Sequence, residues 1–277
     1  MLRKYKPFLR AGAIDTMAYR FNILIWAAVT VCEVACLVFL WLAVYRSSVG
    51  GIDAEIHGFT YREMISYVVL TTIFGFVTFN NDTLWYINND IRKGTIGNTL
   101  IKPISYRGRF AATSLGNLLT MTLMFGVPFY TAALLALGRL GFLPDLSFPA
   151  FFAHLGLFLL AGLCASLLND VIAYLFGVLC FYTTAAWGLN SLKTTVISFL
   201  SGTLLPLAFF PAGLREVVSW MPFAGMSQNP VLILMMKYDL DESLRCVALS
   251  AAWIVALELL AKLLFARAVR RVTVQGG

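Results

Sequence analysis

The chain has 277 residues, of which 60% are hydrophobic and only 13% are charged, and a soluble globule of this size would need more polar residues to cover its surface. The formal net charge is +7, but the Lys and Arg residues lie in short flanks of apolar segments and form no basic face for nucleic acid. The apolar residues form long blocks, several of which exceed the roughly 20 residues that cross a bilayer as a helix. The composition therefore predicts an all-α membrane protein.

The N-terminal segment, residues 1–21, is basic and also carries apolar residues such as Phe8, Leu9 and Ile14. A helix with a basic polar face and an apolar face lies in the membrane interface and does not cross the bilayer. We therefore expect an amphipathic interfacial helix over residues 1–21, on the cytoplasmic side.

Seven apolar stretches follow, and the charges between them indicate how many cross the membrane. Lys and Arg are concentrated in the N-terminal flank, in the loop after the second stretch and at the C-terminal end. Short loops rich in Lys and Arg remain in the cytoplasm, so all three flanks, and both termini with them, are predicted to be cytoplasmic. This orientation requires an even number of spans.

The fourth and fifth stretches, 149–168 and 171–186, are separated only by Asn169 and Asp170. Joining them into one long helix gives an even number of spans. The sequence then predicts six transmembrane helices, over residues 23–45, 64–88, 110–138, 149–186, 194–210 and 245–268.

The segment 210–244 is punctuated by Pro and Gly, and its apolar runs are too short to span a bilayer. Backbone at membrane depth that is not a full helix is tolerated only where protein or water shields it. We expect this segment to form an extracytoplasmic re-entrant helical hairpin before the last span.

Three carboxylates, Glu33, Asp82 and Asp170, are candidates for an intramembrane polar site. Charge at membrane depth is costly and usually faces protein or a water-filled path. For Glu33 the functional interpretation is a substrate or proton site, and the alternative is a carboxyl group that is hydrogen-bonded to a neighbouring helix or exposed and protonated. For Asp82 and Asp170 a structural role at a helix end is the alternative to transport chemistry.

The cytoplasmic loop 88–110 is the most informative polar segment, because it combines charges with an apolar side. Its apolar residues are Ile91, Ile96, Leu100 and Ile101, and its charged rim is formed by Asp90, Arg92 and Lys93. Such a segment could fill a groove on another protein. The alternative is an ordinary cytoplasmic loop.

The sequence contains no enzyme signature. It has no G-x-x-x-x-G-K-[ST] phosphate loop, no G-x-S-x-G, no H-E-x-x-H and only two histidines. The five cysteines lie in or at the start of apolar segments without a C-x-x-C pair, which argues against a metal site. The chain is therefore predicted to be non-catalytic and without a cofactor of its own.

The motif R-K-G-T-I-G-N-T-L-I-K-P-I-S at 92–105 resembles the signature of membrane subunits of type 2 ATP-binding-cassette (ABC-2) exporters. The segment S-G-T-L-L-P-L-A-F-F-P at 201–211 is similar to the same family, and the tail at 270–277 resembles a poorly characterised bacterial branch of it. The resemblance implies a permease whose residues 88–105 contain a coupling helix that docks on an ATPase. The residues it assigns to this contact are Asp90, Ile91, Arg92, Lys93, Gly94, Thr95, Ile96, Asn98 and Leu100.

The resemblance further implies two copies of a separate ATPase subunit, which would bind ATP and Mg, and a second permease, identical or homologous, in a bacterial cytoplasmic membrane. ATP binding would push on the coupling helices and open an outward path between the two permeases. Two alternatives remain from the residues alone. One is a proton-driven secondary transporter that uses Glu33, Asp82 and Asp170 as a relay, and the other is a non-transporting membrane scaffold.

Overall fold

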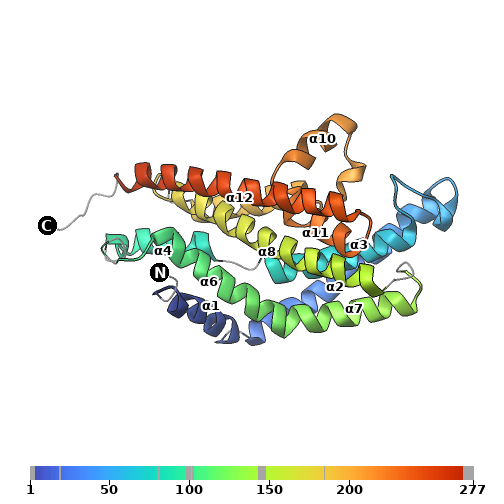
Figure 1. Cartoon of the computed structure of the whole chain (residues 1–277), viewed down its shortest axis with the longest axis horizontal. Coiled ribbons are helices and arrows are strands. Elements are labelled where there is room, and N and C mark those ends of the chain that lie inside the picture. Colours follow the sequence, from blue (N-terminus) through green and yellow to red (C-terminus); the bar gives the residue numbers. More distant parts are fainter. Residues whose placement is uncertain are drawn as a thin grey trace.

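The computed structural model describes residues 4–18, 20–79, 82–97, 101, 103–142, 148–183 and 185–270 (Figure 1). The regular elements in these ranges are all helical. In chain order they are α1 (Lys6–Ala18), α2 (Arg20–Ser47), η2 (Gly51–Asp53), α3 (Tyr61–Thr78), α4 (Thr83–Arg92), α6 (Tyr106–Met121), η3 (Thr122–Gly126), α7 (Val127–Arg139), α8 (Phe148–Leu179), α9 (Ala186–Leu200), η4 (Leu207–Phe209), α10 (Ala212–Trp220), η5 (Ala224–Met226), α11 (Gln228–Leu234) and α12 (Leu240–Val269).

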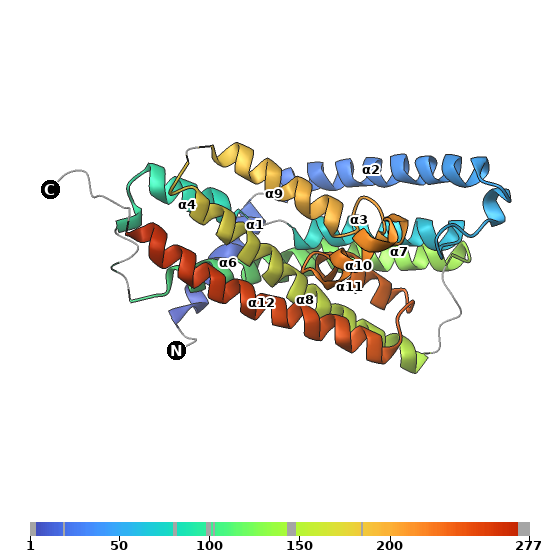
Figure 2. The same ribbon diagram turned by 90° about the horizontal axis from the view of Figure 1, so that it is seen from above.

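Five helical segments in the described part of the chain are long and apolar enough to cross a membrane, and they run along the long axis of the molecule (Figures 1 and 2). They cover Phe21–Ser47, Tyr61–Arg92, Tyr106–Arg139, Pro149–Leu179 and Leu240–Val269. Their lengths of 27 to 34 residues exceed the roughly 20 residues that a bilayer core requires. The chain is a multi-pass helical membrane protein, as its composition predicts.

Two predicted spans are interrupted. The stretch 64–88 is divided between α3 and α4, and α4 begins only after Asp82. The stretch 110–138 contains the π-helical segment η3 between α6 and α7. Pro128 is the second residue after η3, and a proline lacks the N–H for a regular helical bond and clashes with the carbonyl group four residues earlier. The π-helical segment accommodates this proline without ending the helix.

The fifth predicted span differs most from the structure. The stretches on either side of Asn169 form one continuous helix, α8, which ends at Leu179, and α9 then covers Ala186–Leu200 in place of 194–210. At 15 residues, α9 is about 22 Å long, which is shorter than a bilayer core. The chain leaves α9 through Gly202, whose φ of 81° is accessible to glycine without strain. Six spans therefore remain a prediction.

The predicted hairpin 210–244 contains two short helices with different surroundings. α10 is mostly exposed and projects from the bundle in Figure 1, whereas every residue of α11 is buried. α11 packs against α8 and α3. This segment is thus helical and partly enclosed by the spans, and α12 begins after it at Leu240.

The helix α1 packs directly on α6. A Cβ atom at Gly12 would overlap the carbonyl oxygen of Thr113, and one at Gly116 would overlap the carbonyl oxygen of Leu9. Glycine at both positions therefore lets the two backbones touch. The hydroxyl group of Thr16 donates a hydrogen bond of 2.7 Å to the side chain of Asn117, which fixes the register of the two helices.

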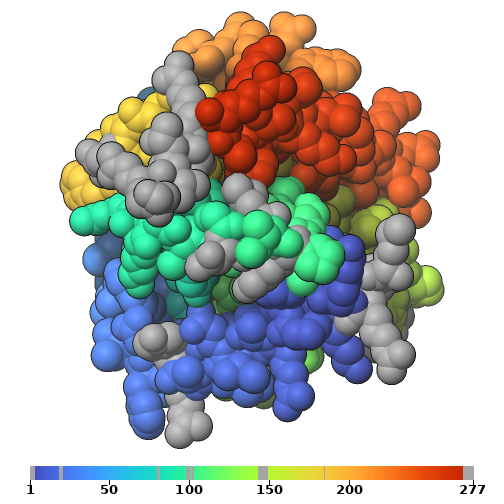
Figure 3. Space-filling model, turned by 90° about the vertical axis from the view of Figure 1, so that its left-hand side faces the viewer, coloured from blue at the N-terminus to red at the C-terminus, as the bar shows by residue number. Residues whose placement is uncertain are grey.

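The beginning of α1 and the end of α12 lie at the same end of the molecule (Figures 1 and 2). Viewed onto this end, α1, α4, the start of α6 and the end of α12 form one continuous face (Figure 3). The two ends of the described chain and the segment after α4 therefore share one side, which is the arrangement that the positive flanks predict.

Candidate functional site

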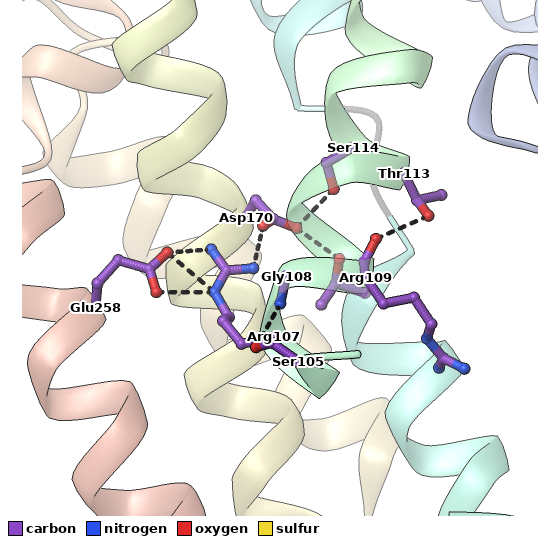
Figure 4. Close-up of polar contacts among 9 residues, drawn as sticks. Ser105, Arg107, Gly108, Arg109, Thr113, Ser114, Asp170 and Glu258 are labelled. Atoms are coloured by element: carbon purple, nitrogen blue, oxygen red, sulfur yellow. Dashed lines mark hydrogen bonds and ion pairs between the residues drawn. The ribbon is translucent and has the colours of Figure 1, made fainter. Parts of the chain in front are cut away.

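The start of α6 places an arginine inside the bundle. Ser105 is the N-cap of this helix, and its hydroxyl oxygen accepts a hydrogen bond of 3.2 Å from the backbone N–H of Gly108. Arg107 lies in the first turn that this cap fixes, and it is only 8% exposed. Its guanidinium group lies between Asp170 of α8 and Glu258 of α12 (Figure 4).

Arg107 binds both carboxylates at once. Its Nη2 donates to Glu258 at 2.6 Å and its Nε donates to the same carboxylate at 3.0 and 3.2 Å, while Nη1 donates to Asp170. Arginine suits such a site because its planar fork of N–H donors matches carboxylate geometry. The guanidinium group also lies 5.2 Å from the ring centre of Tyr174, which adds a cation–π contact.

Asp170 receives hydrogen bonds from three sides. Its Oδ1 accepts from the hydroxyl groups of Thr83 at 2.7 Å and Ser114 at 2.6 Å, and its Oδ2 accepts from Arg107. The residue is completely buried. A buried carboxylate is tolerated when a cation and further donors satisfy its oxygens. The cluster of Thr83, Arg107, Ser114, Asp170 and Glu258, here called the charge cluster, therefore joins α4, α6, α8 and α12.

A second ion pair lies next to the charge cluster, toward the end of α4. Arg109 Nη2 donates to the carboxylate of Asp90 at 2.7 Å, and the hydroxyl group of Tyr106 donates to it at 3.0 Å. The ring of Tyr106 stacks on Phe265 of α12, with ring centres 5.1 Å apart. Asp90 thus ties the end of α4 to the first turn of α6, where Arg107 also lies.

The residues predicted to contact an ATPase differ in exposure. Arg92, Lys93, Gly94 and Thr95 are exposed, Asp90 and Ile91 are half-buried, and Asn98 and Leu100 lie outside the described residues. Ile96 is only 3% exposed and packs in a core with Tyr106 and Phe110. In this conformation the Ile96 side chain fills the protein's own core. Its contact with an ATPase stays a prediction.

The three candidate intramembrane carboxylates do not form one site. Asp170 belongs to the charge cluster, and Asp82 begins α4 one residue before Thr83. The buried Lys193 of α9 is close enough to Asp82 and Asp170 to interact with both electrostatically. Glu33 instead lies on the exposed side of α2, apart from these groups.

Asp170 is the only member of the charge cluster that the sequence singles out. Arg107 and Glu258 are not predicted as site residues. In the structure both bind each other, although 151 residues separate them. Asp170 is the signal that could have pointed to Arg107, because a carboxylate in the middle of a long apolar helix requires a cation from elsewhere.

The arrangement holds four helices together. Both oxygens of the Asp170 carboxylate are occupied by donors from Thr83, Arg107 and Ser114. Within the described ranges, no group of three or more His, Cys, Asp or Glu residues could hold a metal ion. The charge cluster is therefore best understood as a polar joint between four helices.

Comparison with protein families places the chain beside known transporters. The model of the family described as "ABC-2 family transporter protein" matches residues 31–276. This range includes all four helices that the charge cluster joins. A search of curated proteins and a search of solved structures found no match.

Proposed function

The chain belongs to the ABC-2 transporter family, and we propose that it is the permease subunit of an exporter driven by a separate ATPase. The family agrees with the resemblance that the sequence motifs carry. The function proposed for this chain is to form half of the translocation path and to transmit motion from the ATPase to the spans.

The charge cluster is the observation that supports this proposal. The segment expected to contact the ATPase, 88–105, connects α4 with α6. Asp90, near the start of this segment, binds Arg109 in the first turn of α6, and Arg107 then links α6 to α8 and α12. A push on this segment therefore acts on three spans through directional contacts that are made within one helical turn.

The energetics of such a joint suit a change between two arrangements. Hydrogen bonds between ionised groups are stronger and more directional than neutral ones. A small shift of α6 therefore either preserves both ion pairs of Arg107 or breaks one of them. Packed interfaces of this kind change between discrete arrangements and do not deform continuously. ATP binding to the partner would supply the free energy that selects one of them.

The exposed cations Arg92 and Lys93 supply the surface for the ATPase. Both lie at the end of α4, one of the helices seen in Figure 3. We expect an acidic rim around the groove that receives them, since opposite charges steer such encounters and fix their register. Two ATPase subunits, which would bind ATP and Mg, and a second permease would complete the machine. Both termini would lie in the bacterial cytoplasm.

The test is co-purification of this chain with its ATPase. Reversing the two charges with Arg92→Glu and Lys93→Glu should release the ATPase and abolish its stimulation by the permease, while the thermal midpoint of the membrane part stays unchanged. The matched control is Arg139→Glu, because Arg139 is an exposed cation at the end of α7. Binding and stimulation that survive both reversals would show that the coupling segment is assigned wrongly.

The same experiment separates the alternatives. A proton-driven transporter would work without an ATPase and with a steep pH dependence, and a scaffold would show no transport under either condition. In the structure Asp170 is occupied by Arg107, Thr83 and Ser114, so a relay through it would first have to break these contacts.

A further inference from the structure

A cavity of about 610 Å³ lies between α10 and α11. One wall is formed by Ala212, Arg215, Glu216 and Ser219, which follow the spacing of a single helix face. The opposite wall includes Asn229 and Leu232 of α11 together with Leu207 and Phe59. Cavities of this volume, with apolar walls and a few polar groups, are typical of sites for small ligands.

Asn229 presents an unused amide group to this cavity. The residue is 7% exposed and lines the cavity, but its side chain has no hydrogen-bond partner among the described residues. Its neighbour Gln228 differs, since Gln228 Oε1 accepts a hydrogen bond of 2.7 Å from the backbone N–H of Leu207. Buried polar side chains are nearly always paired. The Asn229 amide, which has two donors and one acceptor, is thus available to a ligand.

The α10 wall also carries one cation and one anion that do not neutralise each other. Arg215 and Glu216 are exposed and adjacent in α10. In the described part of the chain neither forms an ion pair, whereas Lys237 in the same cavity is bound to Glu63 at 2.9 Å. A ligand that fits this wall carries a negative and a positive group.

The outer side of α10 indicates where such a ligand comes from. Leu214, Val217 and Trp220 are 43%, 54% and 68% exposed, so this side of the helix is apolar while the cavity side is polar. A helix of this kind lies in the interface between lipid and water. The molecules that present a phosphate, an ammonium group and apolar chains at that depth are phospholipids.

We infer that the cavity between α10 and α11 binds the zwitterionic headgroup of a phospholipid such as phosphatidylethanolamine. Arg215 takes the phosphate, Glu216 takes the ammonium group, and the Asn229 amide donates to an ester carbonyl oxygen of the lipid. Leu207 and Leu232 contact the start of the acyl chains. This site is separate from the charge cluster and does not depend on the ATPase-coupling proposal.

Native mass spectrometry of the purified protein tests this site. The protein in mild detergent is titrated with phosphatidylethanolamine and with phosphatidylglycerol of the same acyl chains, and we expect at least about tenfold tighter binding of the zwitterion, the factor of one charge-assisted hydrogen bond. Glu216→Gln should remove this preference, because phosphatidylglycerol has no ammonium group. Arg215→Gln should weaken both lipids by about tenfold or more.

Two further variants and two controls complete the design. Ala212→Phe places a ring in the cavity from an exposed position and should block the lipid, and Asn229→Leu should weaken it. Arg46→Gln and Asp53→Asn change exposed charges outside the cavity and should bind like the unchanged protein. The thermal midpoint of each variant reports whether it has folded.

The inference is overturned if both lipids bind equally, or if folded Arg215→Gln and Glu216→Gln proteins retain the preference. Displacement of the lipid by free phosphoethanolamine at the same concentration would assign the cavity to a soluble ligand and overturn the lipid assignment. The readout is lipid binding and not ATP hydrolysis, so its failure is distinguishable from a failure of the proposed function.

Discussion

The two ends of the helical bundle are held together by different kinds of contact. Near α1 and α4, Arg107 binds two carboxylates on two other helices. At the opposite end, Tyr45 and Tyr67 donate hydrogen bonds of 2.7 Å each to backbone carbonyl groups, inside an apolar and aromatic core.

The charged end has the contacts of a movable joint, and the apolar end has those of a rigid frame. A cation between several carboxylates can exchange one partner for another, and Lys193 is a second cation within electrostatic reach of Asp170. Tyr45 and Tyr67 instead each donate to one backbone carbonyl oxygen within a packed core. The charged end therefore suits the transmission of motion, and the apolar end suits the maintenance of a fixed geometry.

The largest expected effect comes from breaking the charged end with Arg107→Leu. This change leaves the fully buried Asp170 without its cation, and breaking a buried pair in this way costs about 3–5 kcal/mol. Denaturant unfolding in one detergent measures the loss of stability. The control is Arg139→Leu, an exposed position, where we expect a change below about 1 kcal/mol.

A smaller effect is expected from Gln228→Leu at the opposite end. The change removes the acceptor of the buried Leu207 N–H, and an unpaired buried donor costs about 1–3 kcal/mol. The neighbouring Asn229→Leu loses no bond in the described part of the chain and should cost less by the same measurement. An equal loss in the two variants would show that the Gln228 contact is not what holds η4 to α11.

The smallest effect is expected from Tyr67→Phe. It removes one neutral hydrogen bond to the carbonyl oxygen of Gly202 without changing the ring, which costs about 1 kcal/mol. Stimulation of the ATPase should remain unchanged, since Tyr67 lies outside the charge cluster. If Tyr67→Phe destabilised the protein as much as Arg107→Leu, the contrast between joint and frame would be wrong.

The class of fold was predictable from the sequence because composition and the length of apolar blocks report on lipid exposure directly. The breaks within spans were less predictable. The π-helical segment before Pro128 continues the apolar sequence of the span without a break, so hydropathy does not reveal the segment. The short α9 is displaced because the chain turns at Gly202, and a single glycine within an apolar run is a weak signal.

The candidate site was predictable only in part, for a physical reason. Asp170 stood out because charge is costly at membrane depth, but its partner could not be chosen among the many cations at helix ends. Arg107 follows a loop that is rich in Lys and Arg, and the cytoplasmic orientation of this loop already explains such charges. The sequence therefore does not indicate that Arg107 points into the bundle. Ile96 packs in the protein's own core, which the sequence does not reveal because an apolar residue in a loop can serve a partner or that core equally well.

The contact between α1 and α6 has a consequence for the synthesis of the protein. The partners Thr16 and Asn117 are 101 residues apart in sequence, and ribosomes add on the order of 5–20 residues per second. The helix α1 is thus made roughly 5–20 seconds before the part of α6 on which it packs. The order of translation therefore places the docking of α1 after the synthesis of Asn117.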